Sequence, residues 1–271
     1  MEIREYAEKI ASYISGATVT EIVKNNNVKK VGIVVDMGSK VYPTIYVDEY
    51  YKKNISIEEA VIIIQDILIK HSEDEIDDYA KLMDYEYVKP LLKARLVSNK
   101  NEQYAGISAK KYGYDDLKIV PVIDCSSVGI EGTIVVKKEM VKKWGKNIRT
   151  IVSNALNNIA NDYKMQAMYE FVAEVQGLPK ELAKVIFPEE LEIITNNKKT
   201  FGAIGVISAH EMLKKKYKDG YVVLPSSVHE VIVLNKNINN IEELTNMVQT
   251  VNAQCVSEEE QLSDHAYEIV S

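Results

Sequence analysis

The chain has 271 residues, of which 46% are hydrophobic and 27% are charged. These fractions are typical of an ordinary globular protein, and the length allows one large domain or two smaller ones. The net charge of −7 argues against a general nucleic-acid-binding protein, because phosphate binding needs a basic face. We therefore expect no direct binding of nucleic acid. An acidic chain can still bind a basic partner, including the nucleic-acid channel of another protein.

The two cysteines, Cys125 and Cys255, lie far apart and neither belongs to a CxxC pair. This arrangement argues against a disulfide framework and a zinc site, and it favours a reducing compartment. The first ten residues are charged and amphipathic, and no run approaches the roughly 18 apolar residues of a membrane span. We expect a cytoplasmic protein that has no membrane partner and needs no cofactor.

Apolar residues at helical spacing over 3–14 predict a first helix that ends before Gly16. Residues 17–23 and 30–35 then alternate like paired strands, with the run Asn25–Asn27 as the turn between them. Residues 41–47 predict another strand. A short helical stretch follows it, and Ser56 with Glu59 then forms a capping box for a helix that ends near residue 69.

One arrangement recurs about every 90 residues: a strand, a polar connection and an amphipathic helix, with another strand ahead of them. It predicts an α+β fold in which antiparallel sheets, built from repeated ββα-like units, are flanked by helices. Coincidence remains the alternative explanation for the recurrence. The strand pairs are 31–35 with 44–47, 118–123 with 133–136, and 221–224 with 230–234, and the helices are 56–69, 147–159 and 241–251.

Between these units, residues 72–96 and 165–186 are predicted as helical blocks, and the polar stretch Asn99–Tyr114 is predicted as an exposed loop whose role is open. A domain boundary is placed near residues 162–164. It gives an N-terminal α+β region, 1–162, and a C-terminal α+β region, 163–271.

Within the C-terminal region, strands are predicted over 191–195 and 201–207, followed by a helix over 209–217. Gly202 and Gly205 in the second of these strands indicate a bulge or a close approach of two backbones.

The segment 221–234 places hydroxyls, an imidazole and a carboxylate close together. Two β-branched runs flank a Pro-Ser-Ser turn, which is followed by His229 and Glu230. Ser226, Ser227, His229 and Glu230 contain the residue types of a nucleophile, a base and an orienting carboxylate. On an extended strand only Ser227 and His229 share a face, and no nucleophile elbow surrounds either serine. The alternative, which we favour, is that the hydroxyls bond turn amides and His229 bonds nearby backbone.

Three further residues are candidates for binding. Ser226 lies in the same turn, and His210 with Glu211 begins a predicted helix, where both also suit capping and the helix dipole. A metal would need His229 or His265 in addition, and no HExxH spacing is present, so no metal site is expected. Cys125 follows a buried-looking strand, where a small buried hydrophobe is a better interpretation than a nucleophile.

Two strings in the C-terminal third are distinctive: Thr195-Asn-Asn-Lys-Lys-Thr-Phe-Gly-Ala203 and Leu224-Pro-Ser-Ser-Val-His-Glu-Val-Ile-Val233. On these, on the tail 251–267 and on Tyr42-Pro-Thr-Ile-Tyr46, the chain resembles an uncharacterised domain-of-unknown-function family (number 5688) of Gram-positive anaerobes and their mobile elements. The resemblance covers nearly the whole chain and is weaker over 98–161. It implies a mobile-element or prophage setting, in which small acidic proteins often interfere with host machinery; it implies no mechanism.

Two classes of function follow. The first is a non-enzymatic interaction protein that binds a host or element-encoded protein or complex. One version of it is an inhibitor of a defence complex that imitates nucleic acid with acidic helices. The second is a hydrolase or transferase that uses Ser227 and His229, assisted by Glu211 or Glu230. The sequence leaves the partner, the ligand and the oligomeric state open.

Overall fold

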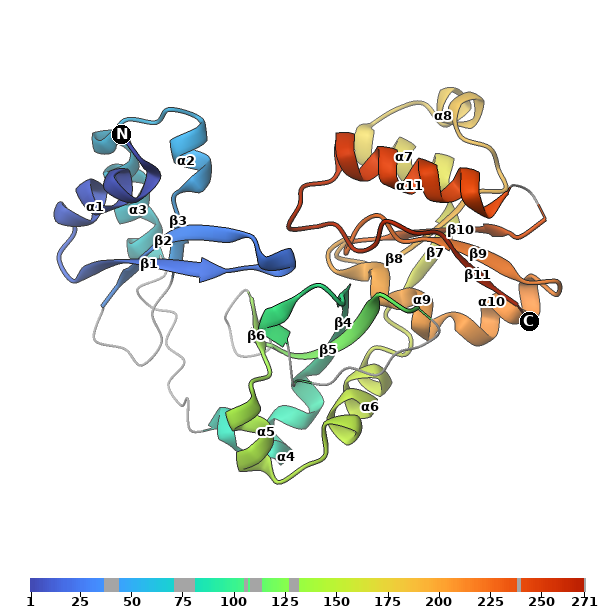
Figure 1. Ribbon diagram of the computed structural model, residues 1–271, viewed down its shortest axis with the longest axis horizontal. Helices are drawn as coiled ribbons and strands as arrows, with labels where there is room; N and C mark the ends of the chain where they lie inside the picture. The colour runs from blue at the N-terminus through green and yellow to red at the C-terminus, as the bar shows by residue number, and fades with distance from the viewer. Residues whose placement is uncertain are drawn as a thin grey trace.

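Three antiparallel sheets follow one another along the chain (Figure 1). The structure is a computed structural model, and it describes residues 1–36, 44–70, 81–104, 107, 114–126, 132–237 and 240–270. Helices flank each sheet, so the predicted α+β class with antiparallel sheets is confirmed.

The first sheet has its own hydrophobic core. Ile33 and Val35 project from one face of the sheet, where they meet Ile10 of the first helix and Ile64 of the third. The alternation that predicted these strands therefore decides which side is buried. The elements are α1 (Ile3–Ser12), β1 (Ala17–Val23), the 3₁₀ helix η1 (Asn25–Asn27), β2 (Lys29–Val35), β3 (Thr44–Tyr46), α2 (Asp48–Lys52) and α3 (Ile57–Lys70), with strand order β1-β2-β3.

The capping residue predicted for α3 is in place, because the hydroxyl oxygen of Ser56 accepts a hydrogen bond from the amide of Glu59 at 3.1 Å. The predicted strand and helical block that begin at residues 41 and 72 lie partly outside the described residues, which resume at 44 and 81.

The second sheet has the order β4-β5-β6. One face carries Leu92, Ala94 and Leu96 into the core, where helix α6 covers them, and the other face carries Lys93 and Arg95. The elements are η2 (Lys81–Met83), α4 (Tyr85–Val88), η3 (Lys89–Leu91), β4 (Leu92–Ser98), η4 (Glu102–Tyr104), β5 (Leu117–Asp124), β6 (Thr133–Val135), α5 (Lys138–Trp144) and α6 (Ile148–Asn158).

The third sheet has five strands in the order β11-β9-β10-β8-β7. It is buried on both faces: Val222 and Leu234 pack toward α11, whereas Val223 and Val233 pack toward the second sheet. The elements are β7 (Lys164–Ala167), α7 (Met168–Gln176), α8 (Lys180–Ile186), β8 (Glu192–Thr195), η6 (Gly202–Ile204), α9 (Gly205–Ser208), α10 (His210–Lys216), β9 (Tyr221–Leu224), β10 (Val231–Asn235), α11 (Ile241–Cys255) and β11 (Tyr267–Ile269).

Each of the three predicted strand pairs is present as antiparallel neighbours: β2 with β3, β5 with β6, and β9 with β10. All five strands of the third sheet come from residues after 163, so the predicted boundary falls between α6 and β7. A single hydrophobic cluster runs across this point, since Ile151 of α6 and Ile194 of β8 both belong to it. The second and third sheets therefore share one core.

Three local predictions are wrong. Residues 92–96 form the strand β4 and not the end of a helix, because their alternation serves a sheet with one buried face. Residues 202–207 of the predicted strand 201–207 form η6 and most of α9, since Gly202 and Gly205 pack too closely on neighbouring backbone and side chains for a strand with side chains on both faces. The stretch 99–114 is predicted to be exposed, but residues near both of its ends, Asn101, Tyr104 and Tyr114, are buried.

The asparagine turn η1 joins the first sheet to the other two. The carboxamide of Asn26 donates to the carbonyl oxygens of Glu258 and Gln261, both at 2.7 Å, and its backbone amide donates to Asn101 Oδ1. Asn101 is fully buried and returns a bond from its Nδ2 to Asn26 Oδ1 at 3.1 Å. One side chain thus bonds the segment after α11 and the segment after β4 together.

The neighbouring residues reinforce this junction. Asn27 Nδ2 donates to the Lys100 carbonyl at 3.0 Å, and Asn25 Nδ2 donates to the Glu259 carbonyl at 3.1 Å. Lys30 forms an ion pair with Glu259. Asn26 and Asn27 have φ values of 57° and 62°, a left-handed conformation that asparagine tolerates better than most residues. The turn therefore needs asparagine for its backbone and for its side chains.

We predict that Asn26→Gly lowers the free energy of unfolding by about 1–2 kcal/mol, because glycine keeps the positive φ but loses the carboxamide bonds. Urea denaturation measures this loss, and hydrogen exchange should increase over 25–27 and 258–261. Asn54→Gly is the matched control, since Asn54 is exposed and also has a positive φ, 54°. Equal stability of the two variants would contradict a joining role for Asn26.

Candidate functional site

The Pro-Ser-Ser-Val-His-Glu segment forms a corner between β9 and β10, and the segment 257–263 packs along it. The Val228 amide donates to the Glu260 carbonyl at 2.9 Å, and the Leu262 amide donates to the Ser226 carbonyl at 3.0 Å. Ser227 pairs with Gln261 in an antiparallel bridge. The corner is therefore held by backbone bonds on both sides.

Ser227 and His229, the candidate catalytic pair, lie in one turn, but the hydroxyl and the imidazole bond other groups. The Ser227 oxygen accepts from the backbone amide of His229 at 3.0 Å, and Ser227 is only 5% exposed. His229 Nδ1 accepts from the Phe201 amide at 3.2 Å. Because Nδ1 accepts, the ring hydrogen is on Nε2, which lies 3.2 Å from Glu260 Oε1.

The carboxylates around the corner differ in their environment. Burial raises the pKa of Glu230, and a hydrogen bond from Ser227 offsets part of the rise. Desolvation alone would raise the pKa of Glu260, but hydrogen bonds from Ser257 and His229 outweigh it and lower the pKa. His229 thus bonds Glu260, from a different segment, and not its sequence neighbour Glu230.

The other candidate binding residues do not form a set. His210 Nδ1 lies 2.7 Å from the hydroxyl of Tyr221 on β9, while Glu211 is exposed on the first turn of α10. Ser226 is half-buried in the corner. Within the described ranges, no three histidine, cysteine, aspartate or glutamate side chains are grouped so that they could hold a metal ion. Cys125 is buried and Cys255 exposed, and neither is in a disulfide.

The corner holds the loop between β8 and η6 in place. Phe201 has a φ of 52° and donates its amide to His229, and Thr195 Oγ1 donates to the His229 carbonyl at 2.9 Å. A Cβ atom on Gly202 would lie 2.5 Å from the Asn196 nitrogen and 2.7 Å from the His229 oxygen, so only glycine fits. The two distinctive sequence strings therefore pack directly against each other.

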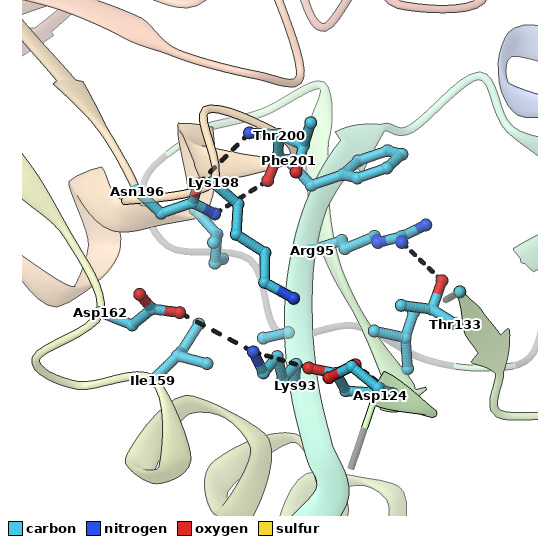
Figure 2. Close-up of a pocket in the computed structure, with 15 residues that line it drawn as sticks. Lys93, Arg95, Asp124, Thr133, Ile159, Asp162, Asn196, Lys198, Thr200 and Phe201 are labelled. Atoms are coloured by element: carbon cyan, nitrogen blue, oxygen red, sulfur yellow. Dashed lines mark hydrogen bonds and ion pairs between the residues drawn. The ribbon is translucent and has the colours of Figure 1, made fainter. Parts of the chain in front are cut away.

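This loop forms one wall of a cavity of about 520 Å³, a size typical of small-molecule sites (Figure 2). The opposite wall is the face of the second sheet that carries Lys93 and Arg95. The lining residues are Lys93, Ala94, Arg95, Val122, Asp124, Ser126, Gly132, Thr133, Ile159, Asp162, Asn196, Lys198, Thr200, Phe201 and Ile204. Sequence reasoning missed this site, because its residues come from five segments that no local pattern connects.

Charged groups of both signs line the cavity. Lys93 Nζ lies 2.8 Å from Asp124 Oδ2 and 4.0 Å from Asp162 Oδ2. Desolvation opposes the ionisation of Asp124, but hydrogen bonds from Lys93 and Ser126 prevail and lower its pKa to about 2. Burial lowers the pKa of Arg95 to about 10, so its guanidinium is still charged at neutral pH. Figure 2 shows Lys93 between the two aspartates, with Arg95 and Phe201 at the other end.

A model of a family of unknown function (DUF5688) matches residues 2–269. The chain belongs to this family. The DUF5688 match spans all three sheets, and both walls of the cavity lie within it. No curated protein and no solved structure matches the chain. Over the described part of this DUF5688 protein, no helix is both long enough and apolar enough to cross a bilayer.

We predict that the ion pair of Asp124 makes stability depend on acid pH. Its folded pKa of about 2 lies below the unfolded value of about 3.9. The stabilisation is therefore complete above about pH 4 and is lost as the pH falls toward 2. Because Lys93 is partly exposed, we expect Asp124→Asn to lower the free energy of unfolding at pH 6 by only about 1 kcal/mol. Urea denaturation of wild type and variant at pH 6 and at pH 2.5 measures this difference, which should be smaller at pH 2.5.

The control for this measurement is Asp66→Asn, which removes an exposed pair with Lys70 on α3. It should change stability little at either pH, since exposed helix pairs contribute only a few tenths of a kcal/mol. An Asp124→Asn variant that parallels wild type over the whole range would contradict the prediction.

Proposed function

We propose that this chain is a cytoplasmic, non-enzymatic interaction protein of a mobile element or prophage, and that it binds another protein through the apolar face of α8. The mobile-element setting is supported by the family resemblance alone. The binding mode is supported by one observation, the exposure of apolar side chains on α8.

Leu182, Val185 and Ile186 are 49%, 83% and 56% exposed. Their spacing of i, i+3 and i+4 places them on one face of α8. Val175, from the adjoining α7, is 55% exposed. Exposed apolar groups that gather on one face, rather than lying singly, favour a surface that a partner covers.

The segment that carries this face is acidic. Residues 168–192 contain six glutamates and two lysines. Both lysines are paired, Lys180 with Glu170 at 3.1 Å and Lys184 with Glu189 at 2.8 Å. Two copies of the face would bring like charges together, so self-association is disfavoured. The complementary occupant is a different protein that has an apolar groove with a basic border.

Proteins with basic borders of this kind include nucleic-acid-binding proteins, because phosphate contacts need lysine and arginine. A defence complex that acts on nucleic acid therefore fits this description of the partner. The chain would inhibit the complex by occupying its basic nucleic-acid-binding surface. This version of the proposal requires binding that weakens as salt is added.

The corner favours this function over a hydrolase or transferase. A serine nucleophile needs its proton taken by a neighbouring base. The Ser227 oxygen instead accepts from the His229 backbone, and both ring nitrogens of His229 are directed to Phe201 and Glu260. The residues that most resemble a catalytic pair are thus used to build the turn.

We predict that Ser227→Ala lowers the free energy of unfolding by about 1 kcal/mol, because the His229 amide loses its acceptor. Partner binding should be unchanged when the protein is assayed below its unfolding transition. A loss of binding or of a measured activity by orders of magnitude, with the fold intact by circular dichroism, would support the enzyme alternative instead.

We predict that Val185→Glu weakens partner binding by at least an order of magnitude, since a charge in an apolar interface lacks a partner. The partner is found by comparing proteins captured by wild type with those captured by the variant. It is then purified, and its affinity for each is measured by calorimetry at low and high salt.

Ile62→Glu is the matched control, because Ile62 is 66% exposed on α3, a helix of the first sheet. Equal affinity of the purified partner for Val185→Glu and wild type would overturn the docking surface. So would light scattering that shows wild type as a dimer and Val185→Glu as a monomer.

A further inference from the structure

The cavity between the second and third sheets has a chemistry that the protein-binding surface on α8 does not explain. Its walls come from different sheets, and three cationic side chains, Lys93, Arg95 and Lys198, reach it (Figure 2). Lys93 and Arg95 are two residues apart on β4, so they project from the same face. Lys198 comes from the loop that the His229 corner holds.

Only one of these cations is balanced by carboxylates of the described residues. Lys93 lies between Asp124 and Asp162. Arg95 and Lys198 have no carboxylate within 4 Å among the residues that the structure describes. Three cations thus meet two carboxylates in the described lining, so the cavity carries one net positive charge, and Arg95 and Lys198 are the two cations without a directly paired carboxylate.

Arg95 is held in a fixed position. Its guanidinium stacks on the Phe201 ring, 3.5 Å from the ring centroid, and one Nη2–H donates to Thr133 Oγ1. A guanidinium has five N–H donors in a planar fork that suits oxyanions. Burial lowers the pKa of Arg95 to about 10, and the interactions with Tyr104 and Asp124 offset only part of that cost of burial.

The loop that carries Lys198 is also fixed. Asn196 Nδ2 donates to the Thr200 carbonyl at 2.8 Å, and the Thr200 amide donates back to Asn196 Oδ1 at 3.3 Å. Phe201 is anchored to His229, as described above. Arg95 is therefore a pre-organised donor, which lowers the entropic cost of binding a ligand, and the exposed Lys198 side chain stands on braced backbone.

We propose that this cavity binds a small hydroxylated organic phosphate, whose phosphate group lies between Arg95 and Lys198. A phosphate monoester carries close to two negative charges at neutral pH and has three terminal oxygens, so it can bind both cations that lack a partner among the described carboxylates, whereas a monocarboxylate has two oxygens and a single charge to share between them. The Lys93 group with its two aspartates offers donors and acceptors for hydroxyls at the other end. Ile159 and Ile204 add apolar surface to the lining.

Binding of a nucleic-acid strand is not what the cavity favours. Stacking of a base needs a free aromatic face, and Arg95 already covers a face of Phe201, the aromatic residue in the lining. The ligand is therefore a small molecule, and this site lies on the opposite side of the third sheet from α8 (Figure 1). The inference does not depend on the proposed protein partner.

The test is isothermal titration of the full chain at low salt with ribose 5-phosphate, ribose, inorganic phosphate and succinate. Ribose 5-phosphate should bind most tightly, inorganic phosphate more weakly, and ribose and succinate not measurably. Arg95→Gln should weaken ribose 5-phosphate binding by at least tenfold, the loss of one charge-assisted fork. Arg95→Lys should bind ribose 5-phosphate with an affinity between those of wild type and Arg95→Gln, because lysine keeps the charge but lacks the planar fork of N–H donors.

Lys198→Gln should also weaken binding several-fold, and it keeps the proposal testable if Arg95→Gln unfolds. The control is Lys215→Gln, an exposed lysine on α10, which should bind like wild type. No binding of ribose 5-phosphate at about 10 mM, or equal binding by wild type and both cavity variants, would overturn the proposal. Tighter binding of succinate would overturn the choice of phosphate.

Discussion

The packing of the loop 196–202 against the corner at His229 is the constraint on which the rest of the candidate site depends. The imidazole accepts the Phe201 amide, the His229 carbonyl accepts Thr195 Oγ1, and Gly202 leaves no room for a Cβ atom between them. Each bond satisfies a group that would otherwise be buried without a partner, which costs about 1–3 kcal/mol per group. His229 therefore links the start of β10 to the loop 196–202.

The link between His229 and the loop also fixes the position of Arg95 on the other side of the loop. Because Phe201 is held at a positive φ, its ring faces the second sheet, where Arg95 stacks on it. The guanidinium in turn donates to Thr133 on β6. The chain of contacts runs from the corner through one aromatic ring to a cation on another sheet, so the cavity is shaped by the residues that hold the two sheets together.

The third sheet separates the two surfaces to which roles are proposed. Along β9 and β10, side chains alternate between α11 on one face and the shared core on the other. Figure 1 shows α7 and α8 on the α11 side and the second sheet on the opposite side. A protein partner on α8 and a small ligand in the cavity would therefore not compete for space. In the part of the chain that the structure describes, the side-chain hydrogen bonds of the asparagine turn go to residues 100–102 and 258–261, which belong to neither surface.

Local sequence determined much of the fold. Short windows of sequence show the alternation at 17–23 and 30–35, the Asn25–Asn27 turn, the Ser56 cap and the three strand pairs, because backbone geometry ties side-chain period to strand or helix. The hydrogen bond from the His229 amide to the Ser227 oxygen also follows from a turn of a few residues.

Tertiary structure alone decided the rest. The apolar, partly β-branched stretch 201–207 predicts a strand, yet residues 202–208 form η6 and α9. The reason is that Gly202 and Gly205 pack closely against β8 and the corner. The partner of His229 is Glu260, thirty-one residues away, rather than Glu230. The cavity gathers Lys93, Asp162 and Lys198 from separate segments. Such long-range proximity is set by which faces pack in the core, and no short window of sequence carries that information.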